Sequence, residues 1–218
     1  MADTFSRAGH GYATPDILTY LDDLHGRHDP GLTRAFEAPT AAGIPAIQVG
    51  RSEGLLLEWL TRAHRVTRAV EVGTLAGYSA IRIARGLAPD GRLYTLERDP
   101  KHAEIARANL AAAGVADRVE VVVGDASESL ALLGGRGPFD LVFVDADKER
   151  YDRYGRWAAE HLRPGGLLIG DNVYFFGKLL DETSEAAAAM RRFHEEARAA
   201  FDTCVVPTPD GMLLGTRR

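Results

Sequence analysis

Three side chains with hard oxygen donors follow two apolar segments in the second half of the chain. Asp145 comes directly after the run 139–144, and Asp171 and Asn172 come directly after the run 167–170. If these runs are neighbouring parallel strands, their carboxyl ends meet at the sheet edge where ligands bind. Two carboxylates and one amide suit Mg²⁺, with Mn²⁺ or Ca²⁺ as alternatives, and the lack of His or Cys disfavours zinc. Each residue alone is more often a helix cap or a turn opener, so the predicted metal site depends on all three.

A lysine close to this acidic set is a candidate general base. Lys148 follows Asp145 by three residues, in a loop that is expected to open the next helix. A neutral lysine amine accepts a proton from a substrate hydroxyl group when a nearby cation favours the neutral form. A lysine after an aspartate is more often a solvated ion pair that contributes little. Beside a metal site, we interpret Lys148 as the residue that deprotonates the substrate.

A glycine-rich loop earlier in the chain predicts a nucleotide site. Gly73 and Gly77 follow the apolar run 68–72 with the spacing G-x-x-x-G, and Glu97 ends the next apolar run, 24 residues after Gly73. Glycines let the backbone approach a ligand closely, and an acid at this distance binds ribose hydroxyl groups. A carboxylate such as Glu71 would repel a pyrophosphate, which disfavours NAD or ATP. S-adenosylmethionine has no phosphate and one cationic end, so Glu71 would face its ammonium group and Glu97 its ribose.

The segment Gly124-Asp125-Ala126 follows the third apolar run and is expected to line the adenine. Simpler interpretations exist for each part of this nucleotide site. The loop glycines also suit a tight strand-to-helix turn without a ligand, and Asp125 also suits a cap for a helix that opens at Ala126. The prediction of a cofactor site therefore rests on the glycine loop, the acid of the second run and this segment together.

These residues need a sheet to position them, and the hydrophobic pattern from residue 68 onward predicts one. Short runs that are apolar on both faces alternate with helical segments, which is typical of a parallel sheet covered on both sides. The fold is expected to be a doubly wound, mostly parallel α/β sheet with an antiparallel C-terminal hairpin. Strands are predicted at 68–72, 92–97, 119–123, 139–144 and 167–170, helices at 78–87, 100–113 and 184–201, and the hairpin at 203–207 and 212–216.

A helical extension is expected to precede this sheet, over residues 1–50, with the main domain at 51–218. Thr14-Pro15 has the pattern of a helix cap followed by proline at the first helical position. Pro30-Gly31 and Pro39 are expected to interrupt the segment that follows. A further helix is predicted over about residues 52–64, with Trp59 in the core or in an interface.

Composition excludes several classes of protein. The 31 acidic residues outnumber the 26 basic ones, for a net charge of −5. Nucleic acids and anionic membranes select for clustered Lys and Arg, so neither is an expected partner. Cys204 is the single cysteine, which rules out an intramolecular disulfide and suggests a reduced, cytoplasmic setting. Its apolar neighbours predict a small core residue.

The motifs together resemble those of a known enzyme family. The segments Glu71-Val-Gly-Thr-Leu-Ala-Gly-Tyr-Ser79, Val144-Asp-Ala-Asp-Lys148 with Tyr151, and Asp171-Asn-Val173 are similar to motifs of the cation-dependent class I S-adenosylmethionine O-methyltransferases. The chain is similar in character to the small bacterial members of the catechol and caffeoyl-coenzyme A O-methyltransferase group. The resemblance runs from about residue 44 to the C-terminus. Residues 46–49 look like the family's segment that folds over the cofactor.

The resemblance implies a Rossmann-like methyltransferase fold and a role for each motif residue. It implies that the metal is held by Asp145, Asp171 and Asn172, and that Lys148 and Asp145 act in catalysis. It also implies a homodimer, in which residues 1–50 contact the substrate and the second subunit, while residues 174–178 shape the substrate pocket. The residues implied to contact S-adenosylmethionine are Val49, Glu71, Gly73, Thr74, Ser79, Glu97, Ala126 and Asp145.

The expected activity is methyl transfer from S-adenosylmethionine to a hydroxyl group of a small catechol-like aromatic compound. The metal would chelate two neighbouring substrate oxygens, and Lys148 would remove the proton. Three alternatives remain open from the sequence. They are a methyltransferase that acts on a different small-molecule nucleophile, a nucleotide-binding oxidoreductase on a related sheet, and a nucleotide-binding module without catalysis.

Overall fold

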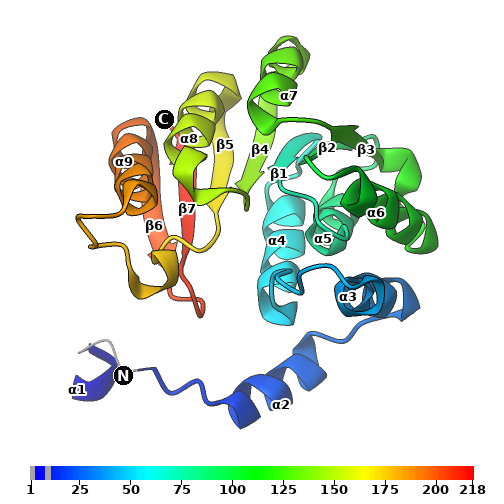
Figure 1. The fold of residues 1–218 in the computed structure, drawn as a ribbon, viewed down its shortest axis with the longest axis horizontal. Coiled ribbons are helices and arrows are strands. Elements are labelled where there is room, and N and C mark those ends of the chain that lie inside the picture. The colour runs from blue at the N-terminus through cyan, green and yellow to red at the C-terminus, as the bar shows by residue number, and fades with distance from the viewer. Residues whose placement is uncertain (1–2, 8–10) are drawn as a thin grey trace.

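A computed structural model describes residues 3–7 and 11–218 of the chain. Its strands are β1 (Arg68–Val72), β2 (Arg92–Glu97), β3 (Val119–Val123), β4 (Phe139–Val144), β5 (Leu162–Gly170), β6 (Phe201–Val206) and β7 (Met212–Arg217). Within the described residues they form one seven-stranded sheet in the order β3-β2-β1-β4-β5-β7-β6 (Figure 1). β1 to β5 are parallel, whereas β7 is antiparallel to both β5 and β6. The predicted doubly wound sheet with a C-terminal hairpin is confirmed.

The strand order reverses between β1 and β4, and this reversal defines where a ligand would bind. β1 lies in the middle of the sheet, with Val72 paired to Leu96 of β2 on one side and to Val144 of β4 on the other. Chain segments that leave two such strands diverge, which opens a crevice beyond their carboxyl ends. Gly73 and Asp145 are the first residues beyond these two ends.

Two hydrophobic layers cover the two faces of the sheet. Side chains alternate along each strand, so Ala69 and Leu141 belong to one layer while Val70 and Val142 belong to the other. The first layer also contains side chains from α3 (Pro30–Ala42), α4 (Arg51–Ala63), α5 (Tyr78–Gly86) and α6 (Pro100–Ala112). The second contains side chains from α7 (Ala126–Leu133), α8 (Tyr151–His161) and α9 (Glu185–Ala200). The sheet is therefore shielded on both faces, as its apolar strands require.

The first two helices, α1 (Thr4–Arg7) and α2 (Pro15–His25), lie outside these layers (Figure 1). The predicted cap is confirmed, because the Thr14 hydroxyl accepts a hydrogen bond from the Ile17 amide and Pro15 is at the first helical position. α2 contributes no buried residue, and its apolar side chains are exposed. No helix in the described part of the chain is long and apolar enough to cross a membrane.

The expectation that prolines interrupt the segment after α2 is wrong, because α3 is continuous from Pro30 to Ala42. Pro30 takes the first helical position behind Asp29, whose carboxylate accepts the Leu32 amide at 3.0 Å. Pro39 lies inside the helix and removes one backbone hydrogen bond. Its ring is buried, and the helix continues through it despite the lost bond. The helix ends at Gly43, which adopts a left-handed conformation with φ 62°.

Three further expectations need correction. β5 begins at Leu162 rather than at 167, because Leu162 pairs with Phe139 across an irregularity that accommodates the Pro-Gly-Gly sequence. Cys204 is exposed rather than in the core, because β6 is an edge strand whose middle residues face solvent. Trp59 is 60% exposed and so does not belong to the core. Its place in an interface stays a prediction.

Candidate functional site

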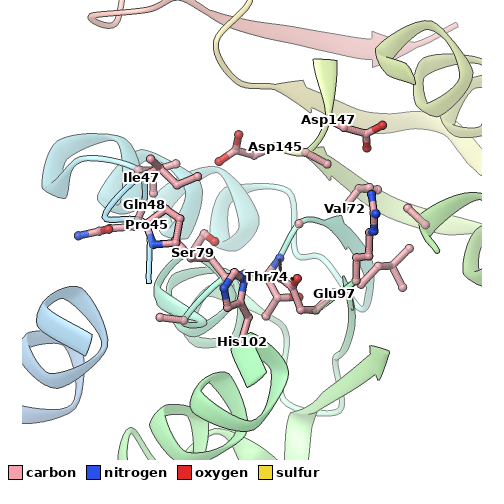
Figure 2. A pocket seen from close by; sticks show the side chains of 18 of the residues that line it. Pro45, Ile47, Gln48, Val72, Thr74, Ser79, Glu97, His102, Asp145 and Asp147 are labelled. Carbon is pink, nitrogen blue, oxygen red and sulfur yellow. Dashed lines mark hydrogen bonds and ion pairs between the residues drawn. The ribbon is translucent and has the colours of Figure 1, made fainter. Parts of the chain in front are cut away.

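A cavity of about 510 Å³ lies at the crevice between β1 and β4. In Figure 2, Pro45, Ile47 and Gln48 lie on its left side, Asp145 and Asp147 at the top, and Glu97 and His102 at the bottom. Most of the residues predicted from the sequence line this cavity: Val49, Gly73, Thr74, Ser79, Glu97, Ala126, Asp145, Lys148 and Asn172. Glu71 and Asp171 are buried and do not form part of its lining.

Gly73 allows the end of β1 to touch the end of β4. Its φ is +100°, and a Cβ atom built on it would lie 2.0 Å from the carbonyl oxygen of Asp145. Any other residue would force the two strand ends apart, since heavy atoms do not approach so closely. Leu75 in the same loop also has a positive φ of 50°. The glycine therefore sets the distance between the cofactor loop and the predicted metal ligand Asp145.

The Glu97 carboxylate holds this loop in place. Its Oε2 accepts hydrogen bonds from the backbone amides of Leu75 at 2.8 Å and of Thr74 at 3.3 Å. Its Oε1 accepts the Asp99 amide at 2.9 Å and lies 3.7 Å from Nδ1 of His102. A carboxylate oxygen accepts two hydrogen bonds, so Oε1 keeps capacity for a ligand hydroxyl. Glu97 thus fixes the loop and still lines the cavity.

Glu71 lies fully buried behind the loop, at the end of a hydroxyl chain. Thr95 donates its hydroxyl hydrogen to Oε2 of Glu71 at 2.5 Å, and the Thr74 and Thr95 hydroxyl oxygens are also 2.5 Å apart. Oε1 of Glu71 has no hydrogen-bond partner. Burial raises the pKa of the Glu71 carboxyl to about 8, against the lowering effect of the Ser79 and Thr95 hydroxyls. A buried acceptor without a partner is costly, so this position suits a ligand that brings a donor.

The raised pKa of Glu71 predicts how stability depends on pH in the ligand-free protein. The folded pKa of about 8 lies above the ordinary value of 4.5, so the folded chain holds this proton more tightly than the unfolded chain. The stability that the protonated Glu71 carboxyl contributes is fully present below pH 4.5 and is lost as pH rises through 8. We expect the free energy of unfolding to fall more steeply between these values in the wild type than in Glu71→Gln. Urea titrations at several pH values measure this, and parallel curves for the two proteins would contradict the assignment.

Asp145, Lys148 and Tyr151 form a connected group at the end of β4. Nζ of Lys148 donates to Oδ1 of Asp145 at 3.1 Å and to the Tyr151 hydroxyl at 2.8 Å. That hydroxyl is buried, and its oxygen lies 2.9 Å from the Asp171 carbonyl and 3.1 Å from the Val144 carbonyl. The lysine is therefore held beside Asp145 rather than extended into solvent, in agreement with the position predicted for a general base.

Asp171 and Asn172 end β5 next to this group. Asp171 is 3% exposed, and its Oδ1 has no hydrogen-bond partner. Burial, together with the charge of Asp145, raises the pKa of its carboxyl to about 7. Among the described residues no cluster of three or more His, Cys, Asp or Glu could hold a metal, so a cation here would depend on the Asn172 amide. The donor set is all oxygen and fits a hard divalent cation.

The opposite end of the cavity is bounded by Gly124 and Ala126. Asp125 between them does not line the cavity. It caps α7, because Oδ1 accepts the Ser127 amide at 2.9 Å, and Oδ2 pairs with Arg150 at 2.6 Å. The simpler interpretation of Asp125 as a helix cap is confirmed. Arg150 also pairs with Asp147 at 3.3 Å, so one guanidinium links the loops after β3 and β4.

Sequence reasoning missed Arg98 and His102 in the cavity lining, whereas Phe176 belongs to the segment 174–178 that is expected to shape the substrate pocket. Arg98 directly follows Glu97, and His102 lies in the first turn of α6, so both belong to the connection that leaves the carboxyl end of β2. That position was a usable signal, since every loop at this edge of the sheet is a candidate. Phe176 lies in the segment 174–178, and no residue-type pattern there predicts which side chain faces the cavity.

Comparisons with known proteins agree with this geometry. The profile of a family described as O-methyltransferase matches residues 30–218. A catechol O-methyltransferase of Mycobacterium tuberculosis is 48% identical over 178 residues, which cover 82% of this chain and 80% of the relative. A catechol O-methyltransferase of Niastella koreensis is 42% identical over 206 residues, which cover 89% of this chain and 93% of the relative. The crystal structure of an O-methyltransferase from Bacillus cereus in complex with S-adenosylhomocysteine has a TM-score of 0.89 and 36% identity, and the match covers 93% of this chain and 97% of that one.

Proposed function

The chain belongs to the O-methyltransferase family, and from this premise we propose that it moves the methyl group of S-adenosylmethionine to one hydroxyl group of a small catechol-like compound. The observation that carries the proposal is the cavity that joins the glycine loop and Glu97 to Asp145, Lys148 and Asn172. The relatives named catechol O-methyltransferase support the substrate class. Family membership disfavours the oxidoreductase and the non-catalytic module. The homodimer stays a prediction. The boundary at residue 50, and the contacts of residues 1–50 with substrate and with a second subunit, also stay predictions.

The loop side of the cavity is the proposed seat of the cofactor. Glu97 would bind the ribose through the free capacity of Oε1, and Gly124 and Ala126 would face the adenine. The unpartnered Oε1 of buried Glu71 would gain a donor from the ammonium end, through or beside Ser79. Val49, Gly73, Thr74 and Asp145 complete the seat. When bound, S-adenosylmethionine supplies a methyl group on a sulfonium centre and leaves as S-adenosylhomocysteine.

The β4–β5 side is the proposed seat of a divalent metal, Mg²⁺ first and Mn²⁺ or Ca²⁺ as alternatives. The proposal is supported by the unpaired Oδ1 of Asp171 and by the neighbouring charge of Asp145. Asp145, Asp171 and Asn172 would hold the metal. A divalent cation bound there would supply charge that favours the ionised form of a substrate hydroxyl and open positions for substrate oxygens.

Lys148 is the proposed general base. Its Nζ lies 3.1 Å from Asp145 and 2.8 Å from the Tyr151 hydroxyl, so the amine is oriented toward the cavity by two fixed partners. Lys148 would take the hydroxyl proton onto Nζ and leave an oxygen nucleophile. Gly73 and Glu97 would hold the loop in the position that aligns this oxygen with the methyl donor, which is where much of the rate comes from.

A pair of substrates tests the proposed function. We expect catechol to be methylated and phenol to react at least about a hundredfold more slowly, since one oxygen cannot chelate as two neighbouring oxygens do. Chromatography of the products with S-adenosylmethionine and Mg²⁺ present measures both rates. A chain that methylates phenol as fast as catechol, or an amine in preference to both, acts on a different nucleophile from the one proposed.

A further inference from the structure

The loop that follows β5 has an unusual backbone. Asn172, Phe175 and Phe176 have φ of 55°, 52° and 53°, in the left-handed region that residues other than glycine rarely adopt. The conformation is strained for the two phenylalanines and persists only where the surroundings impose it. Asn172 and Phe176 both line the cavity. Whatever holds this loop therefore also places a proposed metal ligand and an aromatic side chain at the site.

The turn between β6 and β7 fixes this loop, although it lies more than 30 residues further along the sequence. The two segments lie side by side in Figure 1, and three hydrogen bonds join them. The Val173 amide donates to the Gly211 carbonyl and the Tyr174 amide to the Asp210 carbonyl, both at 3.0 Å. The Phe176 amide donates to Oδ1 of the Asp210 side chain, also at 3.0 Å.

Gly211 makes this contact close. Its φ is +74°, and a Cβ atom on it would lie 2.6 Å from the ring of Tyr174. The backbone of the turn thus packs directly on the loop. Among the three hydrogen bonds, only the one from Phe176 ends on a side chain, so a substitution at Asp210 can remove it alone. The other oxygen of Asp210, Oδ2, is buried without a partner.

We propose that Asp210 is a positioning residue for methyl transfer: its carboxylate holds the 172–177 loop in its left-handed conformation and thereby sets Asn172 and Phe176 at the mouth of the cavity. This inference rests on the proposed function for its kinetic consequence, but not for its structural one. Phe176 is 63% exposed, so its own packing contributes little to fixing the loop. Without the hydrogen bond from the Phe176 amide to Asp210, the strained backbone of Phe175 and Phe176 would relax. The Phe176 side chain would then no longer line the cavity.

Two substitutions separate the hydrogen bond from other roles of Asp210. Asparagine is as good a turn residue as aspartate and keeps an acceptor oxygen at the same distance, whereas alanine removes the acceptor. We expect Asp210→Ala to raise the KM for catechol about tenfold, as the loss of one hydrogen bond would, with little change in the KM for S-adenosylmethionine. Asp210→Asn should behave like the wild type. Asp202→Ala, on an exposed carboxylate of the same hairpin, is the matched control.

Hydrogen exchange provides a readout that does not depend on activity. Mass spectrometry of peptides spanning 172–177 should show about tenfold faster exchange at the Phe176 amide in Asp210→Ala than in the wild type, Asp210→Asn and Asp202→Ala. If Asp210→Ala melts below the assay temperature, Asp210→Glu replaces it, because an added methylene displaces the carboxylate and should also loosen the loop. Unchanged exchange in this peptide, or loosening in Asp210→Asn, overturns the proposal. If hydrogen exchange is faster in Asp210→Ala but the wild-type chain methylates no catechol, the positioning role of Asp210 stands and the proposed function is refuted instead.

Discussion

Replacing Lys148 with methionine is expected to lower kcat for catechol methylation by about a thousandfold, which is within the range that a positioned general base contributes. Methionine keeps the length and apolar stem of lysine but cannot accept the substrate proton. Nζ of Lys148 contacts Asp145 and the Tyr151 hydroxyl, while the loop that would hold the cofactor is fixed by Glu97. Binding of S-adenosylhomocysteine should therefore change by no more than about twofold, because Glu97 still fixes that loop and Asp145 itself is retained.

Rapid-mixing kinetics and calorimetry measure these two quantities on the same protein. Lys101→Met is the matched control, because Lys101 lies exposed on α6 and donates to the Ala42 carbonyl outside the cavity. It should keep the wild-type rate. If Lys148→Met weakens S-adenosylhomocysteine binding and leaves kcat intact, then Lys148 is a cofactor contact and the base must be sought elsewhere.

Replacing Asp171 with asparagine is expected to lower kcat/KM at fixed Mg²⁺ by about a hundredfold or more, with much of the loss recovered at high metal concentration. Asparagine preserves the size of the side chain and one oxygen, but it removes a charge that the proposed metal needs. Asp171 is 3% exposed and has one unpaired oxygen. Such a carboxylate is difficult to explain without a cation.

Stability separates this prediction from simple damage to the fold. Burial raises the pKa of Asp171 to about 7, so at pH 8 the metal-free wild type must keep a buried charge. Asp171→Asn removes that charge and should be at least as stable as the wild type in urea at pH 8 with EDTA present, while its activity is much lower. Asp202→Asn, on the exposed edge strand, should change neither property. A destabilised variant with normal Mg²⁺ dependence would argue for a purely structural Asp171.

The local sequence pattern was sufficient to predict the strands and the acidic residues at their carboxyl ends, because this arrangement repeats along the chain. Apolar runs ended in acids at Glu97, Asp145 and Asp171, and a parallel sheet brings strand ends to one edge, so the site could be placed before any coordinates. Gly73 was also predictable, because a loop between two touching strand ends leaves no room for a Cβ atom. Asn172 and Lys148 then followed from their neighbours in the sequence.

The expectations that were wrong concern residues whose surroundings are set by segments distant in the sequence. Pro39 was expected to interrupt a helix, but α3 continues through it with the proline ring buried. Cys204 was expected inside, since its apolar neighbours do not reveal that β6 lies at the sheet edge. His102 reaches the cavity from the first turn of α6, and Asp210 contacts the loop after β5 from more than 30 residues further along the chain. Neither residue type nor sequence spacing indicates that these side chains reach the cavity or the loop.

The central claim is that this chain transfers a methyl group to a catechol hydroxyl with the help of a cation held by Asp145, Asp171 and Asn172. The most direct test is methyl transfer from S-adenosylmethionine to catechol by the wild-type protein, first with excess EDTA and then with Mg²⁺ in excess of the chelator. The account predicts a loss of at least about a hundredfold with EDTA and full recovery with Mg²⁺. Methyl transfer that continues at the same rate under complete chelation would contradict it.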